Sequence, residues 1–272
     1  MIQDLSHSPL GEKSNYSANY NPALLFAISR AAKRAEINII KPPFTGYDIW
    51  NAYEVSWLNN KGKPIVATAV ITVPCDSPNI FESKSAKLYL NSLNNTKFAT
   101  IDRVRDIVAH DLSLVTGAEV GVELYRLYDY PAEISNAFAA IFLDELDIEC
   151  DQYQTNSELL QVLEQEVSEA VYSDLLKSNC LITNQPDWGS VYIQYSGRKI
   201  DHSSLLRYIV SFRNHNEFHE QCVERIFQDI MTKCRPHKLT VYARYTRRGG
   251  LDINPLRTNC GVEIGNLRLV RQ

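Results

Sequence analysis

A cysteine and an aspartate that could act together lie seven residues apart, Cys180 and Asp187. The run 167–177 ahead of them is typical of a half-buried strand, so Cys180 is expected where a strand ends and a loop begins. A thiolate is a useful nucleophile, and a nearby acid can manage the protons of the same reaction. The pair therefore indicates nucleophilic catalysis, although a cysteine by itself is more often a small buried hydrophobic residue.

A second group of reactive side chains is the octad Glu82–Tyr89, which reads E-S-K-S-A-K-L-Y. The octad opens a predicted helix, whose free N–H groups and partial positive charge favour an anion. Ser83 and Ser85 add hydroxyls, and Lys84 and Lys87 add charge, so the octad predicts binding of a phosphate. The alternative is a serine that caps an ordinary amphipathic helix.

Polar residues are also dense at the start of the longest predicted helix, in 214–220. Glu220 could accept two hydrogen bonds from a guanine-like edge, and Phe218 could lie against a flat ring. These two residues favour a purine-like ligand.

The same helix leaves two other interpretations open. His215, His219 and Cys222 have the spacing H-x3-H-x2-C, which places three possible zinc ligands on one helix face. A zinc-dependent hydrolase that acts on a purine or pterin ring would fit that spacing. A purine- or pterin-binding module without catalysis is the non-enzymatic alternative.

The elements that must position these residues follow one order twice: strand, strand, helix, helix, strand. Such a repeat predicts an α+β fold in which two modules each pack paired helices on one face of an antiparallel sheet. Four residue pairs at one spacing support duplication: Tyr89 with Tyr208, Ser92 with Ser211, Val104 with Val223, and Ile107 with Ile226. The expected runs are 47–58, 65–73, 85–93, 100–114 and 118–128, then 167–177, 190–195, 203–212, 217–234 and 238–245. The expected organisation is an irregular segment 1–40, a first module 41–131, a linker 132–157 and a second module 158–272.

Composition narrows the class of protein. The chain has 272 residues, a net charge of −4 and 44% hydrophobic residues, which argues against a broad basic surface for nucleic acid. Its apolar runs are too short to span a bilayer, and its first residues lack a secretory pattern. Six cysteines without CxxC pairs give little support for disulfides, so we expect a reduced, cytoplasmic protein.

The remaining cysteines, histidines and two helix acids are expected to have no catalytic role. The cysteines should be packing or surface residues, the histidines should have no specific partner, and the acids should be solvated. They are Cys75, Cys150, Cys234 and Cys260; His7, His110, His202 and His237; and Asp111 and Asp229.

The octad matches at every position the signature E-[S/L]-K-[S/A]-x-K-[L/Y]-[Y/F/W] of the NADPH-dependent 7-cyano-7-deazaguanine reductases. The segments 179–187, 217–220 and 247–250 also resemble that family, in its long form with two fused modules. The resemblance implies tandem tunnelling-fold modules, a homodimer, and reduction of a nitrile on a guanine-like base to a primary amine, with NADPH. The product would be 7-aminomethyl-7-deazaguanine, a precursor of queuosine in tRNA.

The resemblance also implies roles for individual residues. Cys180 would attack the nitrile to form a thioimide, and Asp187 would donate the proton. No metal would take part. The substrate would be held by Phe81, Glu82, Ser83, Phe218, His219 and Glu220, and NADPH by Ser83, Lys84, Arg248 and Gly249.

Overall fold

The computed structural model describes residues 17, 19–131, 134–135, 137–262 and 264–272, which form two compact units. The first unit holds residues up to 40, 47–132 and 247–253; the second holds 41–46, 133–246 and 254–272. Two strands, β2 and β11, have residues in both units.

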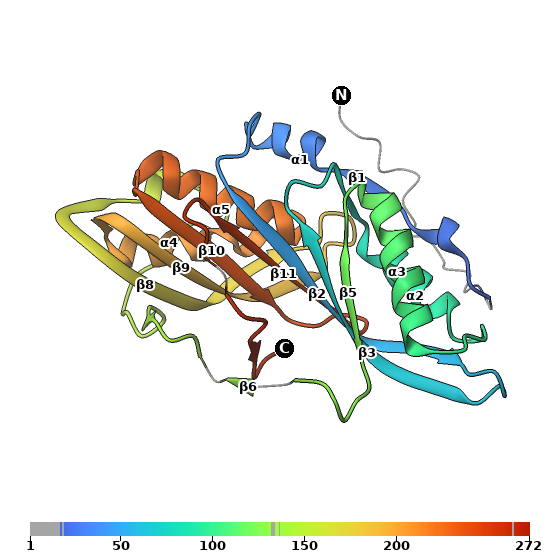
Figure 1. Cartoon of the computed structure of the whole chain (residues 1–272). Helices are drawn as coiled ribbons and strands as arrows, with labels where there is room; N and C mark the ends of the chain where they lie inside the picture. Colours follow the sequence, from blue (N-terminus) through green and yellow to red (C-terminus); the bar gives the residue numbers. More distant parts are fainter. Residues whose placement is uncertain (1–16, 18, 132–133, 136, 263) are drawn as a thin grey trace. The chain divides into compact units, whose positions relative to one another are not determined.

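The first unit is an antiparallel sheet with the order β5-β3-β2, covered by two helices (Figure 1). Its core lies between this sheet and α2 and α3, where Trp50 and Val55 of β2 meet Tyr89 and Val104 of the helices. The elements are η1 (Pro22–Leu24), β1 (Ala27–Ser29), α1 (Arg30–Glu36), β2 (Thr45–Leu58), β3 (Pro64–Pro74), β4 (Asn79–Phe81), α2 (Ser83–Ser92), α3 (Ile101–Thr116) and β5 (Gly121–Tyr125).

The second unit repeats this plan with longer strands in the order β11-β10-β9-β8, to which β7 adds in parallel. Its helices α4 and α5 bury Leu205, Ile209, Val223 and Ile226 completely. The elements are β6 (Ile134–Ser135), β7 (Ile141–Phe142), η2 (Ser157–Leu159), β8 (Val162–Asn179), β9 (Pro186–Ile200), α4 (His202–Val210), η3 (Ser211–Asn214), α5 (His219–Lys233), β10 (Lys238–Tyr245), β11 (Leu251–Thr258) and β12 (Arg268–Leu269).

Each unit contains its own copy of one hydrogen bond between two helices. This equivalence confirms the predicted repeat, and the elements confirm the α+β class. The Tyr89 hydroxyl donates to Asp111 at 2.6 Å, and the Tyr208 hydroxyl donates to Asp229 at 2.7 Å. Both β2 and β8 also contain register shifts, between Ala52 and Val55 in β2, and between Val162 and Glu166 and between Ser173 and Leu176 in β8. The expectation that both aspartates are solvated was wrong, because each accepts a hydrogen bond from a buried tyrosine.

The segment 1–40, expected to be irregular, contains the helix α1 and the strand β1. Hydrophobic periodicity does not reveal α1 because its buried face is charged. Arg30 forms an ion pair with Asp48 at 2.6 Å, and Arg34 donates to the carbonyl of Cys75 at 2.7 Å. His7 lies outside the described residues.

Strand β11 was not predicted, because it contains Pro255 and alternates polar with apolar residues although all eight residues are buried. Its polar side chains are paired instead. Arg257 donates to Glu224 at 2.9 Å, and Asp252 accepts from the Asn51 amide at 2.7 Å. Buried pairing of this kind satisfies polar groups that cannot reach water.

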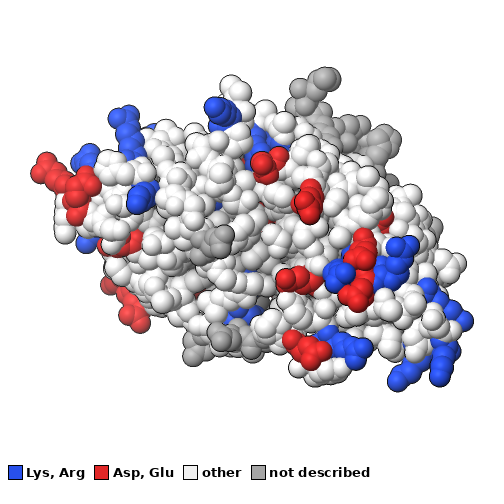
Figure 2. All heavy atoms as spheres, in the orientation of Figure 1, with Lys and Arg blue, Asp and Glu red and all other residues white. Residues whose placement is uncertain are grey.

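Two of the histidines expected to have no partner lie near carboxylates: His202 Nε2 is 2.9 Å from a Glu169 oxygen, and His237 Nε2 is 3.9 Å from a Glu166 oxygen. All six cysteines are free thiols. On the face shown in Figure 2, basic and acidic side chains are interspersed. No helix in the described ranges is both long enough and apolar enough to cross a membrane.

Candidate active site

Cys180 is the first residue of the tight loop that joins β8 to β9. Its N–H donates to the carbonyl of Gln185 at 2.8 Å, and its carbonyl accepts from the N–H of Asn184 at 3.1 Å. Asn184 closes the loop in the left-handed region, with φ of 55°. The Asn216 side chain donates to the same Cys180 carbonyl at 3.1 Å. These bonds hold the cysteine backbone from both sides, so the Cα that carries the buried thiol is fixed in position.

Asp187 is the second residue of β9, directly across the hairpin from Ser178. Its side chain is 3% exposed, and its Oδ2 lies 3.3 Å from Nε2 of His219. The Ser178 hydroxyl is also buried and meets no hydrogen-bond partner within the part of the chain that the structure describes. Buried polar atoms in this situation are typical of sites that receive a ligand or water.

The start of α5 is fixed to the end of β8 by backbone hydrogen bonds. The N–H of Asn179 donates to the His215 carbonyl at 2.8 Å, and the N–H of Glu217 donates to the Asn179 carbonyl at 3.1 Å. Glu217 is further held by Arg225 at 2.6 Å. This short bridge brings the first turn of α5 to the cysteine loop.

The first turn of α5 supplies three of the sequence-predicted residues. Phe218 is its N-cap residue, and His219 and Glu220 are its first two helical residues. His219 is 8% exposed and Glu220 is 4% exposed. Within the second unit, the structure therefore brings together Cys180, Asp187 and this helix start.

Sequence reasoning missed Tyr245, the last residue of β10. Its ring stacks on the His219 imidazole with a centroid distance of 3.9 Å and an angle of 11° between planes. Burial raises the pKa of the Tyr245 phenol well above its usual range, and the neighbouring Cys222 raises it further. Its position at the end of a β-rich run gave no sign of this contact.

The alternative of a zinc site on α5 finds no support in the described residues. No group of three or more His, Cys, Asp or Glu side chains there is arranged to hold a metal ion. His215 lies 3.2 Å from Glu217, and His219 lies beside Asp187. Burial raises the pKa of the Cys222 thiol, which disfavours the thiolate that zinc requires.

In the first unit, the octad begins where the strand β4 ends at Phe81. Glu82 rather than a serine caps α2, because its carboxylate accepts from the N–H groups of Lys84 at 2.6 Å and Ser85 at 2.8 Å. Burial raises the pKa of the Glu82 carboxyl, and these hydrogen bonds oppose that rise. The helix N-terminus expected to hold a phosphate is thus occupied by a carboxylate of the same chain. Ser83 and Lys84 are half-buried at its edge.

The turn 247–250, also in the first unit, lies against β2 and α2. The Arg247 guanidinium lies 4.7 Å from the Tyr53 ring centre, and the carbonyl of Gly250 accepts from the Tyr53 N–H at 2.9 Å. Gly249 has φ of 55°, and a Cβ there would stand 3.0 Å from the Lys87 ammonium. The backbone conformation therefore favours glycine here, and a side chain would also require the end of Lys87 to shift.

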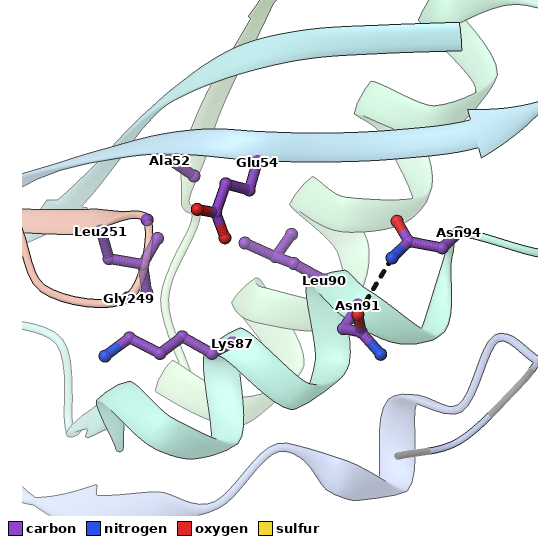
Figure 3. Close-up of a pocket in the computed structure, with 9 residues that line it drawn as sticks. Ala52, Glu54, Lys87, Leu90, Asn91, Asn94, Gly249 and Leu251 are labelled. Carbon is purple, nitrogen blue, oxygen red and sulfur yellow. Dashed lines mark hydrogen bonds between the residues drawn. The ribbon is translucent and has the colours of Figure 1, made fainter. Parts of the chain in front are cut away.

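A cavity of about 100 Å³ lies beside this turn, with polar side chains around an apolar floor (Figure 3). In Figure 3, Lys87 extends along the cavity towards Gly249, and the Asn94 amide donates to Asn91 at 2.9 Å. Its lining residues are Ala52, Glu54, Lys87, Leu90, Asn91, Asn94, Gly249, Gly250 and Leu251. The sequence-predicted residues thus form two groups: the thiol, acid and helix start in the second unit, and the octad and glycine turn in the first.

Family models match both parts of the chain. One described as "Nitrile reductase, 7-cyano-7-deazaguanine-reductase N-term" matches residues 16–124, and one described as "QueF-like protein" matches residues 186–263.

Curated relatives match nearly the whole chain. A protein of Legionella pneumophila (strain Corby) is 56% identical, with 98% of this chain and 95% of the relative covered. Proteins of Cupriavidus pinatubonensis and Burkholderia multivorans are 56% and 54% identical, with 98% of each chain covered. All three are named NADPH-dependent 7-cyano-7-deazaguanine reductase.

Among solved structures, the apo archaeosine synthase QueF-Like is 16% identical, with a TM-score of 0.32. The match covers 37% of this chain and 99% of that one.

Proposed function

We infer that this chain, which belongs to the family of NADPH-dependent 7-cyano-7-deazaguanine reductases, reduces the nitrile of 7-cyano-7-deazaguanine to a primary amine with NADPH. The product is 7-aminomethyl-7-deazaguanine, on the route to queuosine in tRNA. The observation that carries this function to particular residues is the buried group of Cys180, Asp187, His219 and Glu220 in one unit.

Covalent catalysis through Cys180 is the mechanism that this group supports. A nitrile resists direct hydride attack, whereas the addition of a thiolate to its carbon gives a thioimide, whose C=N bond accepts hydride more readily. The thiolate sulfur forms the new bond to carbon as the nitrile nitrogen takes a proton. Asp187, buried a few residues away across the same loop, is the donor of that proton.

Two NADPH molecules, bound one after the other, would each supply one hydride. After the first transfer the Cys180 thiolate is expelled, and after the second the amine is complete. Each transfer also consumes a proton, and the contact of 3.3 Å between His219 and Asp187 offers a route to resupply the acid.

Substrate recognition falls to the carboxylates and rings around the thiol. Glu220 and His219 hold the hydrogen-bonding edge of the guanine-like base, and Phe218 lies against its face. We also propose Phe81, Glu82 and Ser83 as substrate-binding residues. A carboxylate offers about four acceptor sites, so Glu82 can cap α2 and still accept from a ligand.

The cofactor residues we propose are Ser83, Lys84, Arg248 and Gly249. The cavity beside Gly249 supports this choice, because Lys87 supplies charge and Asn91 supplies hydrogen-bonding groups at its edge. These residue types fit a phosphorylated dinucleotide. Its phosphates pair with cationic side chains, and its sugars and bases need hydrogen-bond donors and acceptors. We further propose that the protein acts as a homodimer in the cytoplasm.

The decisive experiment is to incubate the protein with the nitrile base in the absence of NADPH and to measure its intact mass. The mass should rise by that of one base, and Cys180→Ala should show no rise. Cys234→Ala is the matched control, because it removes another buried thiol of the same unit and should leave the rise unchanged. An adduct that persists in Cys180→Ala places the nucleophile elsewhere.

A further inference from the structure

Tyr245 occupies a place that a glycine makes available. It pairs across the sheet with Gly189, two residues after Asp187 on β9. A Cβ on Gly189 would stand 3.2 Å from Cδ1 and 3.3 Å from Cε1 of the Tyr245 ring, so the ring lies directly over this position. The absence of a side chain at Gly189 therefore lets an aromatic ring lie next to the catalytic acid.

The other contacts of Tyr245 leave its ring little freedom. Its side chain is fully buried, and its N–H donates to Asn254 at 3.2 Å. The Gln272 side chain donates to the Tyr245 carbonyl at 3.0 Å and to Asn254 at 2.9 Å. The hydroxyl end of the ring lies beside the buried Cys222 thiol. The backbone of Tyr245 is thus held by hydrogen bonds, and its ring is enclosed by the neighbouring side chains.

The His219 imidazole stacks on the Tyr245 ring, almost parallel, with 3.9 Å between the ring centres. A parallel stack fixes the plane of the imidazole, because rotation of the ring out of that plane would drive it into the tyrosine. In this plane, Nε2 of His219 lies 3.3 Å from the Asp187 carboxylate. The stack thus keeps the imidazole within 3.3 Å of the acid, although no aligned hydrogen bond joins Nε2 to a partner among the described residues.

We propose that Tyr245 is a positioning residue, whose ring, seated over Gly189, holds the His219 imidazole beside Asp187. The inference rests on the proposed function, since it assigns Tyr245 a role through His219 and Asp187. The ring rather than the hydroxyl performs this role, so a phenylalanine at this position should perform it equally well.

The test is a double-mutant cycle read by the rate of adduct formation at low concentration of the nitrile base. Tyr245→Leu should lower that rate by roughly 30- to 100-fold, since a misplacement of about 1 Å costs on the order of 10²-fold. In a His219→Ala background, the same change should cost less than about threefold, because the group that Tyr245 positions is already absent. Tyr245→Phe should restore the rate.

The matched control is Tyr195→Leu. Tyr195 is a buried tyrosine on the neighbouring strand β9, and its hydroxyl donates to Glu169 rather than to a residue of the site. Its effect should be equal in both backgrounds. A purely structural role for Tyr245 would likewise give equal losses in both backgrounds and would overturn the proposal. Equal losses in Tyr245→Phe and Tyr245→Leu would overturn it too. If Tyr245→Leu does not fold, Gly189→Ala, whose methyl group must displace the ring by a few tenths of an ångström, should show the same coupling to His219.

A readout without catalysis separates this inference from the proposed function. The ring current of Tyr245 should shift the imidazole proton signals of His219, identified by their loss in His219→Ala among six histidines. Tyr245→Leu should move these signals and Tyr245→Phe should keep them. Unmoved signals in Tyr245→Leu refute the stack. Shifted signals in a protein that forms no adduct refute the proposed function and leave the stack in place.

Discussion

Asp187→Asn is the substitution that most directly separates proton donation from binding. Asparagine has the shape of aspartate and fits the same buried position between Ser178 and His219. It cannot donate an acidic proton to the nitrile nitrogen. Removing a general acid costs on the order of 10²- to 10⁴-fold in rate, or about 2.7 to 5.4 kcal/mol of barrier. We expect the formation of the Cys180 thioimide to slow by this factor.

A change at Glu220 should weaken binding of the base rather than slow the chemical step. Glu220→Gln replaces one acceptor oxygen with a donor at a position that is 4% exposed, so a buried N–H of the base would lose its partner. A buried unsatisfied group costs about 1 to 3 kcal/mol, which corresponds to a loss of about 5- to 150-fold in affinity. Asp187→Asn should leave the affinity nearly unchanged, because the acid acts on the reacting nitrogen.

The assay has two parts. Affinity is measured by calorimetry in a Cys180→Ala background, where no adduct forms, and the single-turnover rate of adduct formation is measured in variants that retain Cys180. Asp229→Asn is the control, since this acid lies in the same unit and contacts Tyr208 instead of the site. If Asp187→Asn lost affinity at unchanged rate while Glu220→Gln lost only rate, the two roles would have to be exchanged.

Three further outcomes are expected. Lys84→Ala should raise the Michaelis constant for NADPH more than that for the nitrile, because the lysine pairs with phosphate; equal turnover of NADPH and NADH by the unaltered protein would refute a phosphate-selective site. Tyr208→Phe should lower the free energy of unfolding in urea by about 1.5 to 3 kcal/mol, and Tyr89→Phe by less, since its aspartate keeps a second tyrosine donor at 2.7 Å. Burial raises the pKa of Glu82, so the folded carboxyl keeps its proton to higher pH than the unfolded one. The stability contributed by this group is therefore present below its ordinary pKa and is lost as pH rises through the raised value; Glu82→Gln should flatten that slope in denaturant titrations, and an unchanged slope would contradict it.

The sequence predicted those parts of the fold in which apolar residues alone face the core. The paired strands and the helices α2 to α5 follow apolar periodicity, and the octad begins α2 as expected. Strand β11 and helix α1 were missed because their buried positions are charged or polar and are satisfied by partners far away in the chain. Arg257 with Glu224, and Arg30 with Asp48, are such pairs. A pattern of residue types cannot reveal a partner that only the tertiary fold supplies.

The candidate site shows the same division. Cys180 and Asp187 could be singled out because their types and spacing carry chemistry by themselves. Tyr245 could not, because its contact with His219 depends on the register between β9 and β10 and on the absence of a side chain at Gly189. Glu82 was expected to bind a ligand, and its additional task as the cap of α2 depends on a rotamer that the sequence does not specify.

The hairpin β2–β3 and the hairpin β8–β9 differ at their tips. The Asn59 N–H donates to the Lys63 carbonyl, four residues on, at 2.9 Å, whereas the Cys180 N–H donates to the Gln185 carbonyl, five residues on, at 2.8 Å. In each hairpin a proline then opens the return strand, and the residue after it is Ile65 in one and Asp187 in the other. The tip 59–63 is thus a shorter counterpart of the Cys180 loop, exposed at residues 60–63, that carries no thiol and no acid. A fluorophore or a fusion partner attached there would report on the enzyme without entering its chemistry.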